Sequence, residues 1–307
     1  MKIGFFGSPD FALPSLDRLY KSSHDVSLVV TKPDMPKGRK KILQPTIIKK
    51  RALELNIPVL TPSSLTLNFI KELEQYDLDC IVVVAYGKII GPTMLKKYKD
   101  RVINLHPSML PHLRGAAPIH NAILEGLEET GITIMHLCEE LDAGDIIKQI
   151  PFKIEPETYV ETLHDELAVE GAKLLEEVLN DIESGQNSRI AQDNSKATFC
   201  KPIVKSEGKI NWKLDAFEID RHVRAYHVWP GSFTFFEEKL LKIHRVKIVD
   251  KTFDKPGRIV EISEDGLLVS TGDKSILITE LQPATRKIMN VSTFLRGNKM
   301  VLGTQFS

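Results

Sequence analysis

Short apolar runs alternate with amphipathic stretches along the first 184 residues of the chain. The apolar runs predict strands at residues 2–6, 26–30, 58–60, 79–85, 102–105, 131–137 and 146–154. The amphipathic stretches predict a helix that begins at Pro9 behind a Ser8 cap, and further helices at 46–56, 64–75, 118–125 and 158–184. This alternation predicts an α/β fold with a doubly wound, mostly parallel, Rossmann-like sheet.

The pattern of the chain changes after Gly185. Residues 186–206 are polar and irregular, which is typical of a linker. A capped helix is expected from Asp215, and short strands follow at 232–236, 240–249, 257–262, 266–270 and 275–281. Several short strands in succession predict a small, OB-like β-barrel. We therefore expect a catalytic domain at 1–185, a linker at 186–206 and a C-terminal domain at 207–307.

Polar side chains gather where the strand at 102–105 ends. Pro107 and Pro111 lack an N–H group, so the chain must leave the sheet at this point. Asn104, His106 and Ser108 follow one another at intervals of two residues, which places them on one side of an extended chain. Ligands of open α/β sheets bind at the carboxyl ends of strands, so this stretch is the first candidate for an active site.

Composition and cysteine content describe an ordinary globular protein. The chain of 307 residues is 42% apolar and 27% charged, and no apolar run approaches the ~20 residues of a membrane span. The three cysteines lie far apart and outside any metal-ligand spacing. We therefore expect a cytoplasmic protein without structural disulfides.

Positive charge is concentrated in two parts of the chain, although the net charge is zero. Eight basic residues and one acidic residue lie between Thr31 and Arg51, a balance of +7. From Lys205 onward 17 basic and 13 acidic residues give +4. Such clusters are compatible both with a solvated surface and with a polyanionic partner. Residues 31–45 hold three prolines, a glycine and five basic residues, which predicts a long loop.

Several other functions are disfavoured by local sequence. The segment from Gly4 to Gly7 does not match the dinucleotide fingerprint, which argues against NAD. His106, His112 and His120 lack the spacing of metal ligands. Ser108 lacks the context of a nucleophile elbow. Asp142, in the motif LDAGD, is on its own either a turn former or a catalytic carboxylate.

Taken together, these motifs resemble the 10-formyltetrahydrofolate-dependent formyltransferases. The resemblance covers nearly the whole chain and is carried by INLHPSMLPHLRGAAPIHNAI (103–123) and GITIMHLCEELDAGDI (131–146), with support from VVVAYGKIIG, GFFGSPDFA and WPGSFT. The pairing of HPSMLP with LDAGD is specific to this superfamily. Within the superfamily, the chain resembles the tRNA-directed branch, because it has the RGAAPI motif, a basic loop and a C-terminal domain.

The resemblance implies a site and its substrates. Asn104, His106 and Asp142 match the family's catalytic trio. Folate-binding segments correspond to Ser108, Met109, Leu110, Pro111, Tyr86 and Gly87. Basic-loop residues Lys37, Arg39, Lys40 and Lys41 correspond to the tRNA-contacting insertion. The implied reaction moves the formyl group of 10-formyltetrahydrofolate to the amino group of initiator methionyl-tRNA, without a metal; we expect a monomer that binds no membrane.

Three rival functions remain open at this stage. A sugar-amine formyltransferase would share the trio and could carry a C-terminal domain, but it has no use for a +7 loop. A glycinamide ribonucleotide formyltransferase should be considerably shorter. A nucleic-acid-binding protein on a degenerate enzyme scaffold would not need the intact Asn, His and Asp.

Overall fold

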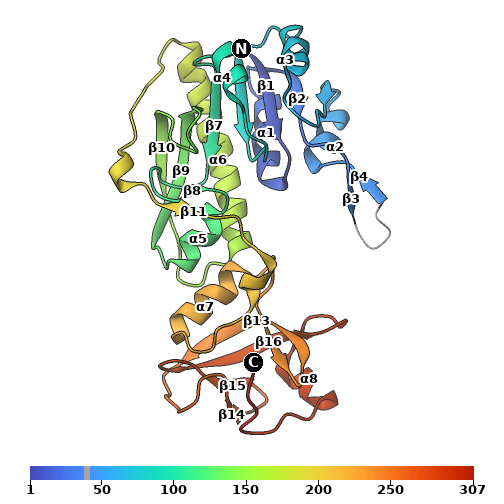
Figure 1. The fold of residues 1–307 in the computed structure, drawn as a ribbon, viewed down its shortest axis with the longest axis vertical. Helices are drawn as coiled ribbons and strands as arrows, with labels where there is room; N and C mark the ends of the chain where they lie inside the picture. Colours follow the sequence, from blue (N-terminus) through green and yellow to red (C-terminus); the bar gives the residue numbers. More distant parts are fainter. Residues whose placement is uncertain (38–41) are drawn as a thin grey trace. The chain divides into compact units, whose positions relative to one another are not determined.

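The computed structural model describes residues 1–37 and 42–307, which form two compact units (Figure 1). The first unit contains Met1–Pro118, Glu129–Lys153 and His164–Cys200. The second unit contains Ile119–Glu128, Ile154–Leu163 and Lys201–Ser307. Within the described residues, no helix is long and apolar enough to span a membrane.

A seven-stranded sheet forms the centre of the first unit, in the order β10-β9-β7-β6-β1-β2-β5. Its strands are β1 (Lys2–Gly7), β2 (Asp25–Val30), β5 (Val59–Leu60), β6 (Cys80–Val84), β7 (Val102–His106), β9 (Glu129–His136) and β10 (Ile146–Lys153). The five strands from β5 to β7 pair in parallel, whereas β9 and β10 are antiparallel additions at one edge. The expected doubly wound, mostly parallel sheet is confirmed.

The order of the strands creates a switch point between β1 and β6. The chain runs outward from β1 through β2 to β5, and then returns to β6 and continues to β7 on the other side. All five residues of β6 and of β7 are buried, which explains the continuous apolar sequence of β6. The carboxyl ends of these strands therefore meet at one edge of the sheet, where the candidate residues follow β7.

Helices connect the strands of the chain, largely at the expected positions. They are α1 (Leu13–Lys21), α2 (Ile47–Glu54), α3 (Leu67–Glu74), α4 (Pro92–Lys97), α5 (Pro118–Leu124), α6 (Val160–Glu183), α7 (Ala216–Ala225) and α8 (Val291–Gly297). Thr46 and Thr66 cap α2 and α3 by accepting hydrogen bonds from the backbone three residues on. Two of these helices, α4 and α8, were not expected from the sequence pattern.

Ser8 does not cap the first helix, contrary to expectation. A 3₁₀ turn at Asp10–Ala12 precedes α1, which begins at Leu13. The Ser8 hydroxyl instead donates to the carbonyl of Tyr86 and accepts from the amide of Lys32. It thereby joins the loops that follow β1, β2 and β6, which is a tertiary role that local sequence does not reveal.

The basic stretch at 31–45 is more regular than a loop. Strands β3 (Met35–Lys37) and β4 (Ile42–Gln44) pair as an antiparallel hairpin. Three of the predicted tRNA-binding residues, Arg39, Lys40 and Lys41, lie outside the described residues. Two of the nearby cations are already paired, because Lys49 contacts Asp34 and Arg51 contacts Asp17.

The segment expected to be a linker folds against the first unit as far as Cys200. Strand β11 (Phe199–Cys200) pairs in parallel with β8 (Arg114–Gly115), directly after the candidate site. A polar sequence without periodicity looks like a linker because its hydrogen-bond partners are distant in sequence.

The second unit is built around an antiparallel sheet. Its strands are β12 (Phe233–Phe236), β13 (Lys239–Val249), β14 (Ile259–Ile262), β15 (Leu267–Ser270), β16 (Ser275–Pro283) and β17 (Met289–Asn290). Asp215 and Glu218 form the expected capping box of α7. One apolar face of α7, with Ile219 and Val223, packs into the core of the sheet. These strands form a half-barrel, which confirms the expected fold class of the C-terminal part.

Candidate active site

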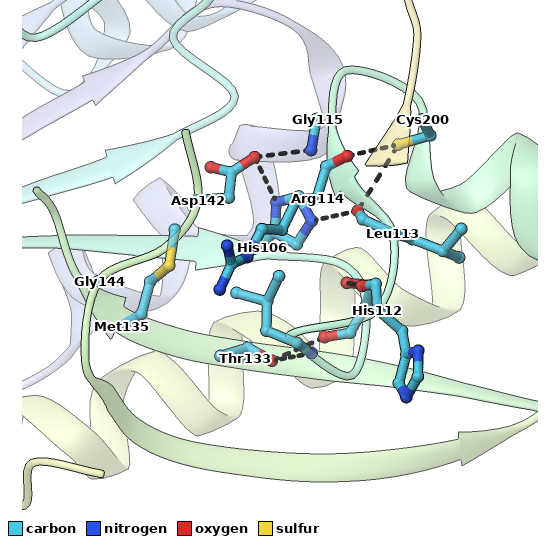
Figure 2. A network of polar contacts seen from close by, with 12 residues as sticks. His106, His112, Leu113, Arg114, Gly115, Thr133, Met135, Asp142, Gly144 and Cys200 are labelled. Carbon is cyan, nitrogen blue, oxygen red and sulfur yellow. Dashed lines mark hydrogen bonds and ion pairs between the residues drawn. The ribbon is translucent and has the colours of Figure 1, made fainter. Parts of the chain in front are cut away.

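His106 and Asp142 face each other at the carboxyl end of β7 (Figure 2). His106 is buried, and its Nδ1 lies 3.8 Å from Oδ2 of Asp142. Its Nε2 lies 3.0 Å from the carbonyl oxygen of Leu113. A carbonyl oxygen can only accept a hydrogen bond, so Nε2 carries a proton and Nδ1 faces the carboxylate. The ring is thus fixed in one tautomer.

Asp142 is held in place by backbone geometry rather than by a cation. Its φ of 50° lies in the left-handed region, which Asp tolerates better than most residues. The amide of Gly115 donates a hydrogen bond of 2.8 Å to Oδ2, the same oxygen that faces His106 (Figure 2). The carboxylate therefore links the turn that carries LDAGD to the loop that follows β7.

Two glycines allow these loops to come together. A side chain on Gly115 would collide with the carbonyl oxygen of Cys200, and its φ of 117° is a conformation that other residues rarely adopt. A side chain on Gly144 would collide with the carbonyl oxygen of His136. The close packing of three backbone segments at the site depends on both residues.

Asn104 brings an amide group to the same strand end. It is only 9% exposed, and among the described residues no hydrogen bond to its side chain is found. A largely buried amide without a partner costs free energy unless a ligand or water satisfies it. Asn104 and His106 lie two residues apart on β7, so their side chains point to the same face of the sheet.

The loop from Ser108 to Pro111 satisfies its polar groups internally. The Ser108 hydroxyl donates to the carbonyl of His112 at 2.6 Å, and the Leu110 amide donates to the Thr133 hydroxyl. Thr133 in turn donates to the Ser108 carbonyl at 2.7 Å. Leu110 itself is buried against Met135 and Ile146. The contacts give this loop a structural role beneath the site.

Tyr86 and Gly87 follow β6 on the neighbouring strand. The Tyr86 ring is buried edge-on against Phe6, and burial raises the pKa of its hydroxyl to about 12. Gly87 has a φ of 72°, and a side chain at this position would collide with the ammonium group of Lys32. Tyr86, one of the predicted folate contacts, therefore packs in the hydrophobic core of the first unit.

A cavity of about 260 Å³ borders the Asp142 turn, and sequence reasoning did not find it. Its walls come from α4, the start of β7, the end of β9 and the LDAGD turn, and include Leu95, Tyr98, Val102, Leu137, Ala143 and Gly144. His136 also lines the cavity, and burial lowers the pKa of its imidazole. The apolar spacing of Met94, Leu95 and Tyr98 could have predicted α4, but not the cavity.

Lys37, the predicted tRNA-binding residue that the structure describes, ends strand β3. Among residues 1–37 and 42–307, no group of three or more His, Cys, Asp and Glu side chains is arranged to hold a metal ion. The structure places His106 opposite Asp142, with Asn104 two residues before His106 on β7.

A doubly wound sheet that gathers an amide, an imidazole and a carboxylate at one strand end is the arrangement of a group-transfer enzyme. A family model described as formyl transferase matches residues 1–179, and one described as formyl transferase, C-terminal domain, matches residues 202–299. The chain therefore belongs to the formyl transferase family.

Similarity over the full length points to one branch of this family. The chain is 42% identical to a methionyl-tRNA formyltransferase of Sulfurihydrogenibium sp. (strain YO3AOP1), with 100% of both chains covered. It is 41% identical to the methionyl-tRNA formyltransferase of Bacillus subtilis (strain 168), covering 98% of this chain and 96% of that one. Among solved structures, an N-formyltransferase from Helicobacter canadensis in complex with folinic acid and dTDP-3-aminofucose shares the fold, with a TM-score of 0.68 and 22% identity over 91% of this chain and 99% of that chain.

Proposed function

We propose that this enzyme transfers the formyl group of 10-formyltetrahydrofolate to the amino group of initiator methionyl-tRNA. The observation that carries the proposal is the set formed by Asn104, His106 and Asp142, with a cavity next to the turn that carries Asp142. Full-length similarity to methionyl-tRNA formyltransferases supports the choice of the amine. The cytoplasm is the proposed location, since a reducing compartment suits the free thiols of Cys80 and Cys138.

Each member of the trio has a distinct proposed role. The reaction forms a bond between the attacking nitrogen and the formyl carbon, and breaks the bond from that carbon to folate N10. The formyl oxygen gains negative charge on the way, so it needs preorganised donors. The amide of Asn104, which has no hydrogen-bond partner among the residues the structure describes, is one donor, and His106, once protonated at Nδ1, is the other.

Asp142 is the proposed carrier of protons. The attacking amine must lose a proton and N10 must gain one, so that no net proton is consumed. The carboxylate faces Nδ1 of His106 at 3.8 Å, close to the imidazole but without a direct hydrogen bond to it. The Gly115 amide fixes the position of this carboxylate.

The cavity beside Asp142 suits the ring end of a folate. Its walls combine apolar side chains with the polar groups of His136, Asp100, Asp145 and Arg189, so a ligand there would meet both apolar contacts and hydrogen-bonding partners. Leu95, Val102 and Leu137 would contact the faces of a flat bicyclic ring, and the LDAGD turn would supply backbone partners. Folate supplies the activated formyl group. We propose that the loop at Ser108–Pro111 and the turn at Gly87 support the folate site from its surroundings.

The tRNA is proposed to contact the basic hairpin and the C-terminal domain. Lys37 ends β3, and Arg39, Lys40 and Lys41 lie between β3 and β4 in the sequence. The balance of +4 after Lys205 suits contacts to phosphates, whose affinity should fall steeply as salt rises. The proposed domains are those expected from the sequence: a catalytic domain at 1–185, a linker at 186–206 and a C-terminal domain at 207–307. The proposed active form is a monomer.

One assay tests the proposal as a whole. Purified protein is mixed with 10-formyltetrahydrofolate and either methionyl-tRNA or an amino-sugar nucleotide, and formylated product is measured. We expect product with methionyl-tRNA and none with the sugar nucleotide. The reverse result would favour a sugar-amine formyltransferase, the type of enzyme represented by the Helicobacter canadensis structure.

A further inference from the structure

The side chain of Gln192 connects the two loops of the candidate active site. Its Oε1 accepts hydrogen bonds from Nε and Nη2 of Arg114, at 3.0 and 2.7 Å. Its Nε2 donates to the backbone carbonyl of Asp142 at 2.9 Å and to that of Gly144 at 2.7 Å. Gln192 belongs to the segment expected to be a linker, far from either loop in sequence.

The Gln192 amide has four partner atoms, two nitrogens of Arg114 and two backbone carbonyl oxygens, and their hydrogen-bonding chemistry allows only one orientation of the amide. The Arg114 guanidinium can only donate, and the two carbonyls can only accept. The oxygen of Gln192 must face Arg114 and its nitrogen must face the LDAGD turn. Because Arg114 is buried and charged, its bonds polarise the amide and strengthen both of the donated bonds.

We propose that Gln192 is a positioning residue that holds the Asp142 carboxylate against His106, with Arg114 as its anchor. Arg114 directly precedes Gly115, whose amide binds the Asp142 side chain. Gln192 binds the backbone carbonyl of Asp142. Both the backbone and the side chain of Asp142 are therefore connected to the loop of Arg114 and Gly115. The inference rests on the proposed catalytic role of Asp142.

The rest of the segment is anchored independently of Gln192. Ile190 exchanges two backbone hydrogen bonds with Ile146, of 2.8 and 2.9 Å. Thr198 accepts from the amides of Arg114 and Leu113, through its carbonyl and its hydroxyl. Removal of the Gln192 amide should therefore leave the segment in place and the protein folded.

The first experiment measures kcat and KM of full-length variants with methionyl-tRNA and 10-formyltetrahydrofolate. Gln192→Ala should lower kcat on the order of 10²-fold with little change in KM, because a misplacement of about 1 Å costs that much. Gln186→Ala makes the same chemical change at an exposed position of the same segment and should match the wild type.

Gln192→Glu separates positioning from stability. Glutamate keeps the oxygen partner of Arg114 but has no N–H to donate to the Asp142 and Gly144 carbonyls. We expect its kcat to fall as in Gln192→Ala, while its melting temperature stays near that of the wild type. A Gln192→Glu variant with wild-type kcat would overturn the proposal, since anchoring Arg114 alone would then suffice.

A double-mutant cycle with Asp142→Asn tests the route of action. If Gln192 acts through Asp142, Gln192→Ala should lower kcat no further in the Asp142→Asn background. Retention of the full loss in that background would overturn the inference alone. An Asp142→Asn variant with wild-type kcat would instead remove the catalytic role of Asp142, and the inference with it.

Discussion

Asn104 and His106 contribute in different ways, although they stand two residues apart on β7. His106 is hydrogen-bonded through Nε2 to the carbonyl of Leu113, and its Nδ1 faces the carboxylate of Asp142 at 3.8 Å. Asn104 has no hydrogen-bond partner among the described residues. The imidazole is thus preorganised by the protein, whereas the amide is available to a substrate oxygen.

At the residue scale, we predict that removal of one polar group slows formyl transfer without weakening the fold. Asn104→Ala should lower kcat about 10²–10³-fold, because one donor to the developing oxyanion is lost. Asp142→Asn, which keeps an acceptor for the Gly115 amide, should also lower kcat strongly. Steady-state kinetics at saturating substrates measures both effects; near-wild-type kcat in either variant contradicts its assignment.

At the element scale, the site depends on how closely its loops approach one another. Gly144→Ala would drive a methyl group into the His136 carbonyl, so the LDAGD turn must shift and carry Asp142 away from His106. We predict a fall in kcat larger than the fall in melting temperature. Gly91→Ala is the matched control, since nothing lies within 4 Å of the added carbon. Equal kcat in the two variants would contradict the prediction.

The hairpin of β3 and β4 gives a second prediction at this scale. Arg39→Ala, in the segment that joins the two strands, should raise KM for methionyl-tRNA and leave folate binding unchanged. A guanidinium suits both phosphate and base-edge contacts, neither of which a folate requires. Kinetics with tRNA and fluorescence titration with folate separate the effects. Equal losses in both assays would refute a tRNA-specific role.

At the scale of the whole molecule, four histidines make stability depend on pH. These histidines are His24, His136, His222 and His244. Burial is the main cause that lowers the pKa of each imidazole below 6.5. Below that value the unfolded chain binds more protons than the folded one, so the free energy of unfolding falls as pH falls. Well above about pH 6.5 these histidines are neutral in both states and this contribution is complete.

The prediction is a urea midpoint that drops between about pH 7 and about pH 5.5. His222→Gln should reduce this drop, because Gln cannot take up a proton where His222 meets Ser232 and the Glu207 carbonyl. Unfolding curves of wild type and variant at both pH values provide the measurement. An identical pH dependence in the two proteins would exclude His222 as a contributor.

The sequence by itself determined most of the elements and the type of chemistry. The apolar run of β6 and the capping box at Asp215 are local patterns, and local propensity and burial enforce them. The resemblance of HPSMLP and LDAGD to a known family selected Asn104, His106 and Asp142 before any distance was known.

Only the tertiary structure decided how those residues are held. Ser8 joins three loops instead of capping a helix, and the supposed linker brings Gln192 to the active site. The cavity beside Asp142 likewise draws its walls from four separate segments. The physical reason is the same in each case: a hydrogen bond or a cavity wall depends on which chain segments meet in space, and periodicity along the sequence carries no information about partners many residues away.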